Sequence, residues 1–139
     1  MVTPYVVFDG NCKEALEFYE RVFSSKVKMM QTYGEYIPDG IESPPQNLKN
    51  WILHAEIEIC GTNFWLADDV QPVTNGNMIR LAAIVPTAKE ANNVFEMLSD
   101  GGHVTMQPVE SFYSTFHATV TDAFGINWNI VAEESPNKF

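Results

Sequence analysis

The sequence predicts an α+β fold in which two βαβββ modules form curled mixed sheets around a cavity, with the helices on the outer faces. The first observation is an internal repeat: residues 13–19 (KEALEFY) are echoed by residues 89–95 (KEANNVF), and residues 61–66 (GTNFWL) by residues 125–130 (GINWNI). The second is a hydrophobic pattern that runs strand, helix and three strands, twice over. Two echoes in the same order indicate a duplicated module within one domain of 139 residues.

The first module is expected to span residues 1–70. Asp9-Gly10-Asn11 supplies turn and N-cap residues before a helix, and Glu14 is placed for a capping interaction. Residues 34–50 contain three prolines and two glycines and show no period, which predicts a flexible loop. The expected elements are a strand over residues 3–8, a helix over residues 12–23, and strands over residues 25–33, 51–59 and 63–67.

The second module, residues 77–132, repeats this order. Thr87 is the expected N-cap of its helix, which ends at Gly101-Gly102. The polar tail, residues 133–139, is expected to fray. The expected elements are a strand over residues 78–85, a helix over residues 88–99, and strands over residues 103–107, 115–121 and 127–132.

Alternation within the strands predicts which side chains face the helices. Over residues 51–59, Leu53, Ala55, Ile57 and Ile59 share one side, which needs a helix to cover it. By the same parity, further helix-facing positions are Phe64, Leu66, Ile79, Leu81, Trp128 and Ile130. The opposite side carries His54, Glu56, Trp65, Arg80, His117, Thr119, Asn127 and Asn129. This polar and aromatic set predicts a concave cavity with a few directed hydrogen-bonding groups.

Charge and cysteine content narrow the function classes. Eighteen acidic and eight basic residues give a formal net charge of −10, which repels nucleic acid and would attract a cationic ligand, although acidity mostly serves solubility. Cys12 and Cys60 lie in different elements and form no CxxC motif, so no disulfide framework is expected. No apolar run is long enough for a membrane span and no targeting segment is visible, so a cytoplasmic location is expected.

Three stretches carry a family resemblance: residues 4–23 (PYVVFDGNCKEALEFYERVF), residues 54–69 (HAEIEICGTNFWLADD) and residues 112–130 (FYSTFHATVTDAFGINWNI). They resemble the PhnB-like branch of the vicinal-oxygen-chelate superfamily, which includes glyoxalases, bleomycin-resistance proteins and dioxygenases. The resemblance covers nearly the whole chain. It implies two βαβββ modules around a cavity and a homodimer. Members of this branch often bear a demethylubiquinone methyltransferase label, but no Gly-rich turn for a methyl donor opens either helix.

The resemblance also implies where a metal would bind. Metal-dependent members place four His or Glu ligands on the concave face, and the matching positions here are Pro4, Trp65, Arg80 (or Met78 in a shifted register) and Asn129. These are poor ligands for a divalent metal, so no metal and no cofactor are expected. A different metal site built from His54, Glu56 and His117 remains an alternative. Ser114 stands where the family has glycine, so this loop departs from the family pattern.

The candidate site residues follow from these arguments. Glu56 and Arg80 are interpreted either as a structural ion pair or as a base and an anion-binding group. His54 is either a satisfied core histidine or a general base. The candidates for catalysis are His54 and Glu56. The candidates for ligand binding are His54, Glu56, Trp65, Arg80, Phe112, His117 and Asn129.

These residues lead to competing functional hypotheses. The first is a metal-independent protein that binds an unidentified small molecule, with neither nucleic acid nor membrane as partner. The second is an enzyme of the same superfamily, of lyase, isomerase or dioxygenase type, using His54, Glu56 and Arg80. A residual metalloenzyme and methyl transfer complete the alternatives.

Overall fold

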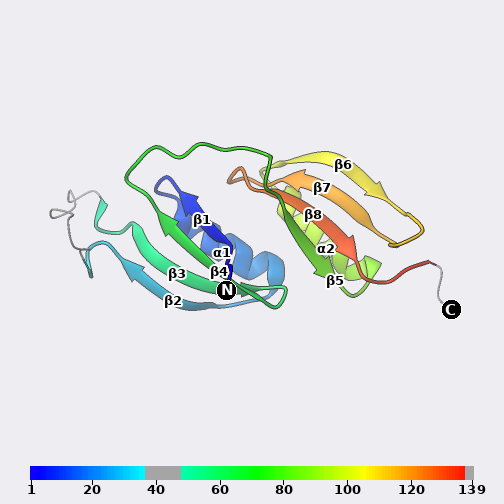
Figure 1. The fold of residues 1–139 in the computed structure, drawn as a ribbon, viewed down its shortest axis with the longest axis horizontal. Helices are drawn as coiled ribbons and strands as arrows, with labels where there is room; N and C mark the ends of the chain where they lie inside the picture. The colour runs from blue at the N-terminus through cyan, green and yellow to red at the C-terminus, as the bar shows by residue number, and fades with distance from the viewer. Residues whose placement is uncertain (37–47, 137–139) are drawn as a thin grey trace. The chain divides into compact units, whose positions relative to one another are not determined.

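The computed structural model describes residues 1–36 and 48–136 and divides the chain into two units, residues 1–74 and residues 75–139 (Figure 1). Most of the loop expected over residues 34–50 lies outside the described residues, as do the last three residues of the tail. Within the described residues, no helix has the length and apolar character that crossing a bilayer requires.

The first unit is a four-stranded sheet with one helix packed on it. The strand order is β1-β4-β3-β2, in which β1 runs parallel to β4 and the other pairs are antiparallel. Its elements are β1 (Tyr5–Phe8), α1 (Cys12–Phe23), β2 (Val27–Thr32), β3 (Ile52–Ile59) and β4 (Thr62–Asp68).

The second unit repeats this topology with the strand order β5-β8-β7-β6 and one parallel pair, β5 with β8. Its elements are β5 (Leu81–Val85), α2 (Ala88–Ser99), β6 (His103–Val109), β7 (His117–Thr121) and β8 (Asn127–Ala132). Two mixed sheets, each with its own helix on one face, confirm the predicted α+β fold of two βαβββ modules. The face of each sheet away from its helix is called the open face below.

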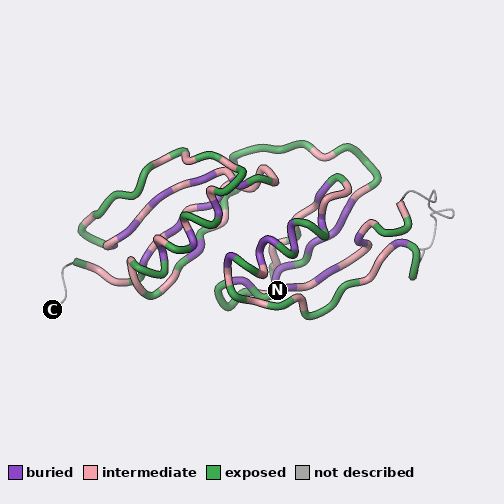
Figure 2. The backbone as a smooth tube through the Cα atoms, turned by 180° about the vertical axis from the view of Figure 1, so that it is seen from behind, coloured by how far each residue is buried: buried purple, intermediate pink, exposed green. Residues whose placement is uncertain are grey.

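Each core lies between a helix and its sheet. Buried positions alternate along β8 and recur along the side of each helix that meets the sheet (Figure 2). In α1 the buried side chains are Cys12, Ala15, Leu16, Phe18, Tyr19 and Val22. Phe64 and Leu66 of β4, and Trp128 and Ile130 of β8, are buried on the helix side, as strand parity predicted.

The start of α1 is capped by a distant side chain and not by its neighbours. The side chain of Asn11 makes no capping hydrogen bond, so the expected local capping arrangement with Glu14 is wrong. Asp68, at the end of β4, accepts hydrogen bonds from the backbone N–H groups of Gly10 (2.9 Å) and Cys12 (3.0 Å). At α2, by contrast, the predicted cap is confirmed, since the Thr87 side chain accepts from the N–H of Glu90.

Two parity predictions fail for identifiable reasons. The pairing of β2 with β3 is irregular between Gln31 and Thr32, and Ile52 is fully buried (0% exposed) while Leu53 is half-buried. The first core position of β3 is therefore Ile52. Strand β5 begins at Leu81, later than expected, which leaves Ile79 outside the ladder and 83% exposed.

Candidate functional site

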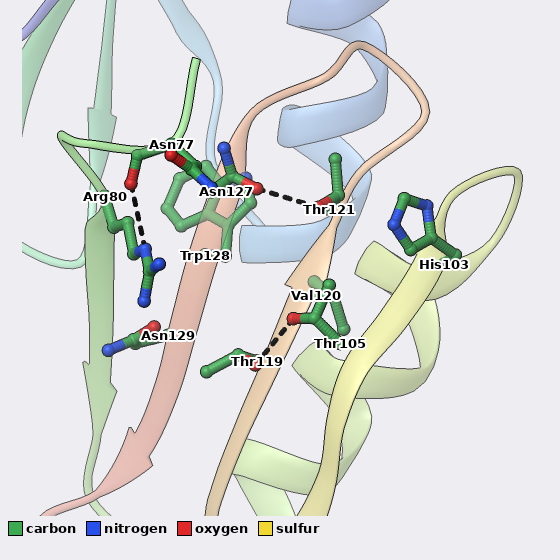
Figure 3. A pocket seen from close by; sticks show the side chains of 10 residues that line it. All are labelled: Asn77, Arg80, His103, Thr105, Thr119, Val120, Thr121, Asn127, Trp128 and Asn129. Atoms are coloured by element: carbon green, nitrogen blue, oxygen red, sulfur yellow. Dashed lines mark hydrogen bonds between the residues drawn. The ribbon is translucent and has the colours of Figure 1, made fainter.

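A cavity of about 440 Å³ opens in the second unit, over the polar end of its sheet (Figure 3). It draws on β6, β7 and β8 and on the segment that leads into β5. The polar side chains used in the argument below are Arg80, His103, Thr105, Thr119, Asn127 and Asn129. The sequence predicted Arg80, Thr119, Asn127 and Asn129 on this face, and the structure brings these four together.

Hydrogen bonds hold much of this wall in place. The Thr105 and Thr119 hydroxyls lie 2.6 Å apart, so one donates to the other across β6 and β7. Asn127 accepts from the Thr121 hydroxyl (2.7 Å) and donates to the carbonyl of Gly76 (2.8 Å). A wall of paired side chains is preorganised, because binding need not order them first.

Arg80 supplies the permanent charge of the cavity. Its Nε donates to the carbonyl of Asn77 at 3.1 Å, which anchors the guanidinium beside the pocket. None of the ten residues that line the cavity is a carboxylate, although the chain has 18 acidic residues. The local charge therefore opposes the net charge of the chain.

The remaining predicted residues of the second unit lie near the start of β7. The Tyr113 hydroxyl is 2.9 Å from Nδ1 of His117. Phe112 is 78% exposed, and its ring packs edge-on against Tyr113 with centroids 5.4 Å apart. Two atoms on the open face of the second sheet, Nε2 of His117 and Oδ1 of Asn129, are buried without a hydrogen-bond partner among the described residues.

Ser114 has a structural role in the loop before β7. It is fully buried, and its hydroxyl accepts from the N–H of Phe116 (3.1 Å). The same hydroxyl lies 2.7 Å from the carbonyls of both Phe116 and Ala132, which share its one proton as acceptors. Serine therefore ties this loop to the end of β8, a bond that glycine could not make.

A second polar cluster occupies the open face of the first sheet. Nε2 of His54 lies 3.2 Å from Oε2 of Glu56, and Asn63 donates to Oε1 of Glu56 at 2.8 Å. The hydrogen bond from Asn63, followed by that from His54, lowers the pKa of the Glu56 carboxyl. Glu56 is thus held as a carboxylate beside the imidazole.

Two exposed aromatic rings flank this pair. Trp65 (40% exposed) packs edge-on against His54 with centroids 5.0 Å apart, and against Tyr5 (55% exposed) at 6.0 Å. The sequence did not identify Tyr5 or Asn63. The pairing of β1 with β4 would have identified Tyr5, which is directly opposite Trp65 in the parallel pair. Asn63 lies two residues before Trp65 and therefore on the same side of β4.

The positions expected to carry metal ligands are shifted by the real register. The residues directly opposite Trp65 and Asn129 are Tyr5 and Ala82, not Pro4 and Arg80. The phenol, indole, methyl and amide groups at these four positions do not fit a divalent metal, which prefers imidazole, carboxylate or thiolate. Among the described residues, no three His, Cys, Asp or Glu side chains cluster closely enough to hold an ion.

Two predicted constellations span the two units and stay predictions: the Glu56–Arg80 pair, and the alternative metal site of His54, Glu56 and His117. Within its own unit, Glu56 bonds to His54 and Asn63, whereas Arg80 bonds to Asn77.

Cys12 is no reactive thiol: it is fully buried, and burial together with the nearby Asp68 carboxylate raises its pKa.

Comparison with known proteins places the chain in a family. The family profile described as 3-demethylubiquinone-9 3-methyltransferase matches residues 1–131. Protein YjdN of Escherichia coli (strain K12) is 25% identical over 146 residues, covering 99% of both chains. The crystal structure of protein PA1353 from Pseudomonas aeruginosa superimposes with a TM-score of 0.82 at 25% identity, covering 96% of this chain and 97% of that one.

Two further structures share the fold. A putative 3-demethylubiquinone-9 3-methyltransferase, PhnB protein, from Bacillus cereus has a TM-score of 0.76 at 22% identity, covering 94% and 98% of the two chains. A glyoxylase/bleomycin resistance protein/dioxygenase domain from Frankia sp. EAN1pec has a TM-score of 0.66 at 12% identity, covering 96% and 97%. With its repeated βαβββ units and a profile match over nearly its whole length, the chain belongs to the PhnB-like, 3-demethylubiquinone-9 3-methyltransferase family, with the fold of the vicinal-oxygen-chelate superfamily.

Proposed function

We propose that the protein binds a small molecule without a metal, and that the ligand occupies the open face of the second sheet. The observation that carries the proposal is the cavity of about 440 Å³, walled by hydroxyl, amide, imidazole and guanidinium groups. Ligand pockets of roughly 300–1,000 Å³ with a few directed polar groups are typical of small-molecule sites.

The charge of the cavity favours an anionic ligand. The terminal nitrogens of Arg80 have no partner among the described residues, and a guanidinium binds a carboxylate through two parallel hydrogen bonds. The net charge of −10 by itself favoured a cationic ligand. At contact distance the charges that line the cavity determine which ligand charge is attracted, since charges further away than a Debye length of about 8–10 Å are largely screened.

Metal independence is supported by the donor set. The cavity wall offers one imidazole, His103, with amides and hydroxyls, and Arg80 repels a cation placed beside it. Methyl transfer is not part of the proposal, because no glycine-rich cradle opens α1. A Cβ on Gly10 would lie 2.6 Å from the Trp51 ring, so the indole already fills that space.

The test is isothermal titration of the full chain with benzoate, phenylacetate and indole-3-acetate. We expect at least one of these acids to bind, and Arg80→Gln to weaken it by about tenfold or more because the bidentate contact is lost. Arg21→Gln on α1 removes the same charge as a matched control and should leave the affinity unchanged. If no acid binds, or if both variants weaken binding equally, the proposed site is wrong. If EDTA abolishes binding and zinc restores it, the metal independence is wrong.

A second candidate function is acid–base catalysis at His54 and Glu56. The specific observation is their contact at 3.2 Å, in which an anchored carboxylate orients an imidazole. Such a pair suits abstraction of a proton next to a carbonyl group. The test is exchange of the methyl protons of pyruvate in D₂O, followed by NMR. His54→Gln should abolish exchange, while Glu58→Gln, a neighbouring exposed carboxylate, should not; exchange that persists in His54→Gln rules this function out.

A further inference from the structure

Two buried polar atoms on the open face of the second sheet are left unpartnered: Nε2 of His117 and Oδ1 of Asn129. They belong to adjacent strands, where Thr119 is opposite Asn129 and His117 is opposite Val131. His117 and Asn129 are therefore diagonal neighbours on one face, with Cβ atoms about 7 Å apart or somewhat less. A buried donor or acceptor without a partner is unfavourable, so a group that pairs with both atoms would be bound favourably.

Tyr113 decides which of these atoms is the donor. Its hydroxyl lies 2.9 Å from Nδ1 of His117, and a phenol is a better proton donor than a neutral imidazole. The hydroxyl of Tyr113 therefore donates to Nδ1, which places the ring proton of the neutral imidazole on Nε2. His117 then presents a donor, and Asn129 presents an acceptor beside it.

A hydroxyl group complements this pair, because a single oxygen can accept from Nε2–H and donate to Oδ1. A carboxylate cannot donate to Asn129, and an ammonium cannot accept from His117. Asn129 also lines the cavity with Arg80, whose guanidinium points toward Asn129 (Figure 3). A hydroxyl at His117 and a carboxylate at Arg80 can thus belong to one ligand.

The adjoining part of the same face is apolar. Ile84 of β5 is opposite Val131 of β8, two residues beyond the pair of Ala82 with Asn129, so both side chains are on the open face. Ile84 is half exposed. This area offers a hydrophobic support for the remainder of a ligand, beside the hydroxyl position.

We propose that His117 and Asn129 form a hydroxyl-binding subsite, positioned by Tyr113, and that the ligand is a hydroxycarboxylic acid with an apolar or aromatic substituent. This inference rests on the proposed function, in which Arg80 binds the carboxylate. A site built to hydrogen-bond a hydroxyl discriminates strongly against the analogue that lacks it, since the buried polar groups are then left unpaired.

The experiment compares acids that differ only in the hydroxyl group: mandelate with phenylacetate, and 3-phenyllactate with 3-phenylpropanoate, each hydroxy acid as both enantiomers. Titration should show at least one hydroxy acid binding about tenfold or more tightly than its partner. Asn129→Ala should weaken binding of the hydroxy acid more than binding of the deoxy acid, and so remove this preference. Asn93→Ala, on the exposed side of α2, is the matched control and should retain the preference.

A second readout does not depend on affinity. In ¹⁵N-detected NMR of the imidazole, His117 of the free protein should be the Nε2–H tautomer, and Tyr113→Phe should shift the tautomer populations. The hydroxy acid should move the Nε2 resonance of His117 more than the deoxy acid does. Correct folding of each variant is checked by its amide spectrum.

The outcomes separate this inference from the proposed function. Equal binding of hydroxy and deoxy acids, with both weakened by Arg80→Gln, overturns the hydroxyl subsite and leaves the anion site standing; a bound water would then occupy the pair. A hydroxyl preference that survives Asn129→Ala also overturns the subsite. Failure of every acid to bind overturns both.

Discussion

Replacing Asp68 by alanine tests how the first unit is held together. The carboxylate is 3% exposed and accepts three backbone hydrogen bonds, from Gly10 (2.9 Å), Cys12 (3.0 Å) and Ile52 (2.9 Å). One side chain thereby joins the end of β4 to the start of α1 and the start of β3. Alanine leaves all three donors without an acceptor.

The expected loss follows from these bonds. The donors of Cys12 and Ile52 are buried and each costs about 1–3 kcal/mol when left unpaired, whereas the part-buried donor of Gly10 costs less, so the sum is about 2–7 kcal/mol. Burial raises the pKa of Asp68, which shows that the buried charge itself carries a cost, and alanine removes that cost. We therefore expect a net loss in the lower half of this range, about 2–4 kcal/mol, a large part of the roughly 5–15 kcal/mol that stabilises a typical domain.

The assay is urea unfolding, combined with native-state hydrogen exchange that reads the two units separately. Asp68→Ala should lose protection at the amides of Cys12 and Ile52, while amides of the second sheet stay protected. Asp69→Ala is the matched control, since within the described part of the chain Asp69 accepts only an exposed bond from the N–H of Gln71. A loss below about 1 kcal/mol, or one equal to that of Asp69→Ala, would refute the reasoning.

Three further predictions concern the corrected core, the Glu56 carboxyl and the loop before β7. Ile52→Ala should cost about 2–5 kcal/mol by leaving a cavity, whereas Ile79→Ser should change stability by less than about 0.5 kcal/mol; equal effects in urea unfolding would contradict this assignment of the core. Asn63→Ala should raise the pKa of Glu56 toward its ordinary value, as followed by carboxyl ¹³C NMR, because the largest cause of the lowered pKa is removed. Since the folded pKa of Glu56 is the lower one, its contribution to stability is present above the unfolded pKa and lost as pH falls through the folded pKa; in Asn63→Ala that contribution should be smaller and its loss complete at a higher pH, and an unchanged titration would contradict the assignment. Ser114→Ala should destabilise the second unit by about 1–3 kcal/mol, because the N–H of Phe116 loses a buried acceptor, and unaltered exchange of that amide would count against this role.

Much of the architecture was predictable because its signals are local. Both helices begin and end where the apolar period predicted, over residues 12–23 and 88–99, and Thr87 caps the second helix. Helical spacing and an N-cap depend on side chains within one or two turns, so a single sequence carries them. The order of the elements and the repeat were sufficient to predict two βαβββ modules.

Strand parity identified the correct face of most strands but not the partners on it. His54 and Glu56 were expected on one side of a strand, and they lie in contact there. The ends of strands were less predictable: Ile52 replaces Leu53 in the core because the β2–β3 pairing is irregular, and Ile79 is exposed because β5 starts late. A shift of one residue reverses which side of the sheet a side chain faces.

The amino-acid sequence by itself determined the two modules, the two helices and a polar open face that contains Arg80, His117 and Asn129. Only the tertiary structure decided that Asp68 caps a helix 56 residues away and that His117 and Asn129 are left as a donor and an acceptor with no partner. The physical reason is that periodicity reports on neighbours along one element. Hydrogen bonds between elements depend on strand register, which is settled only when the whole sheet packs against its helix.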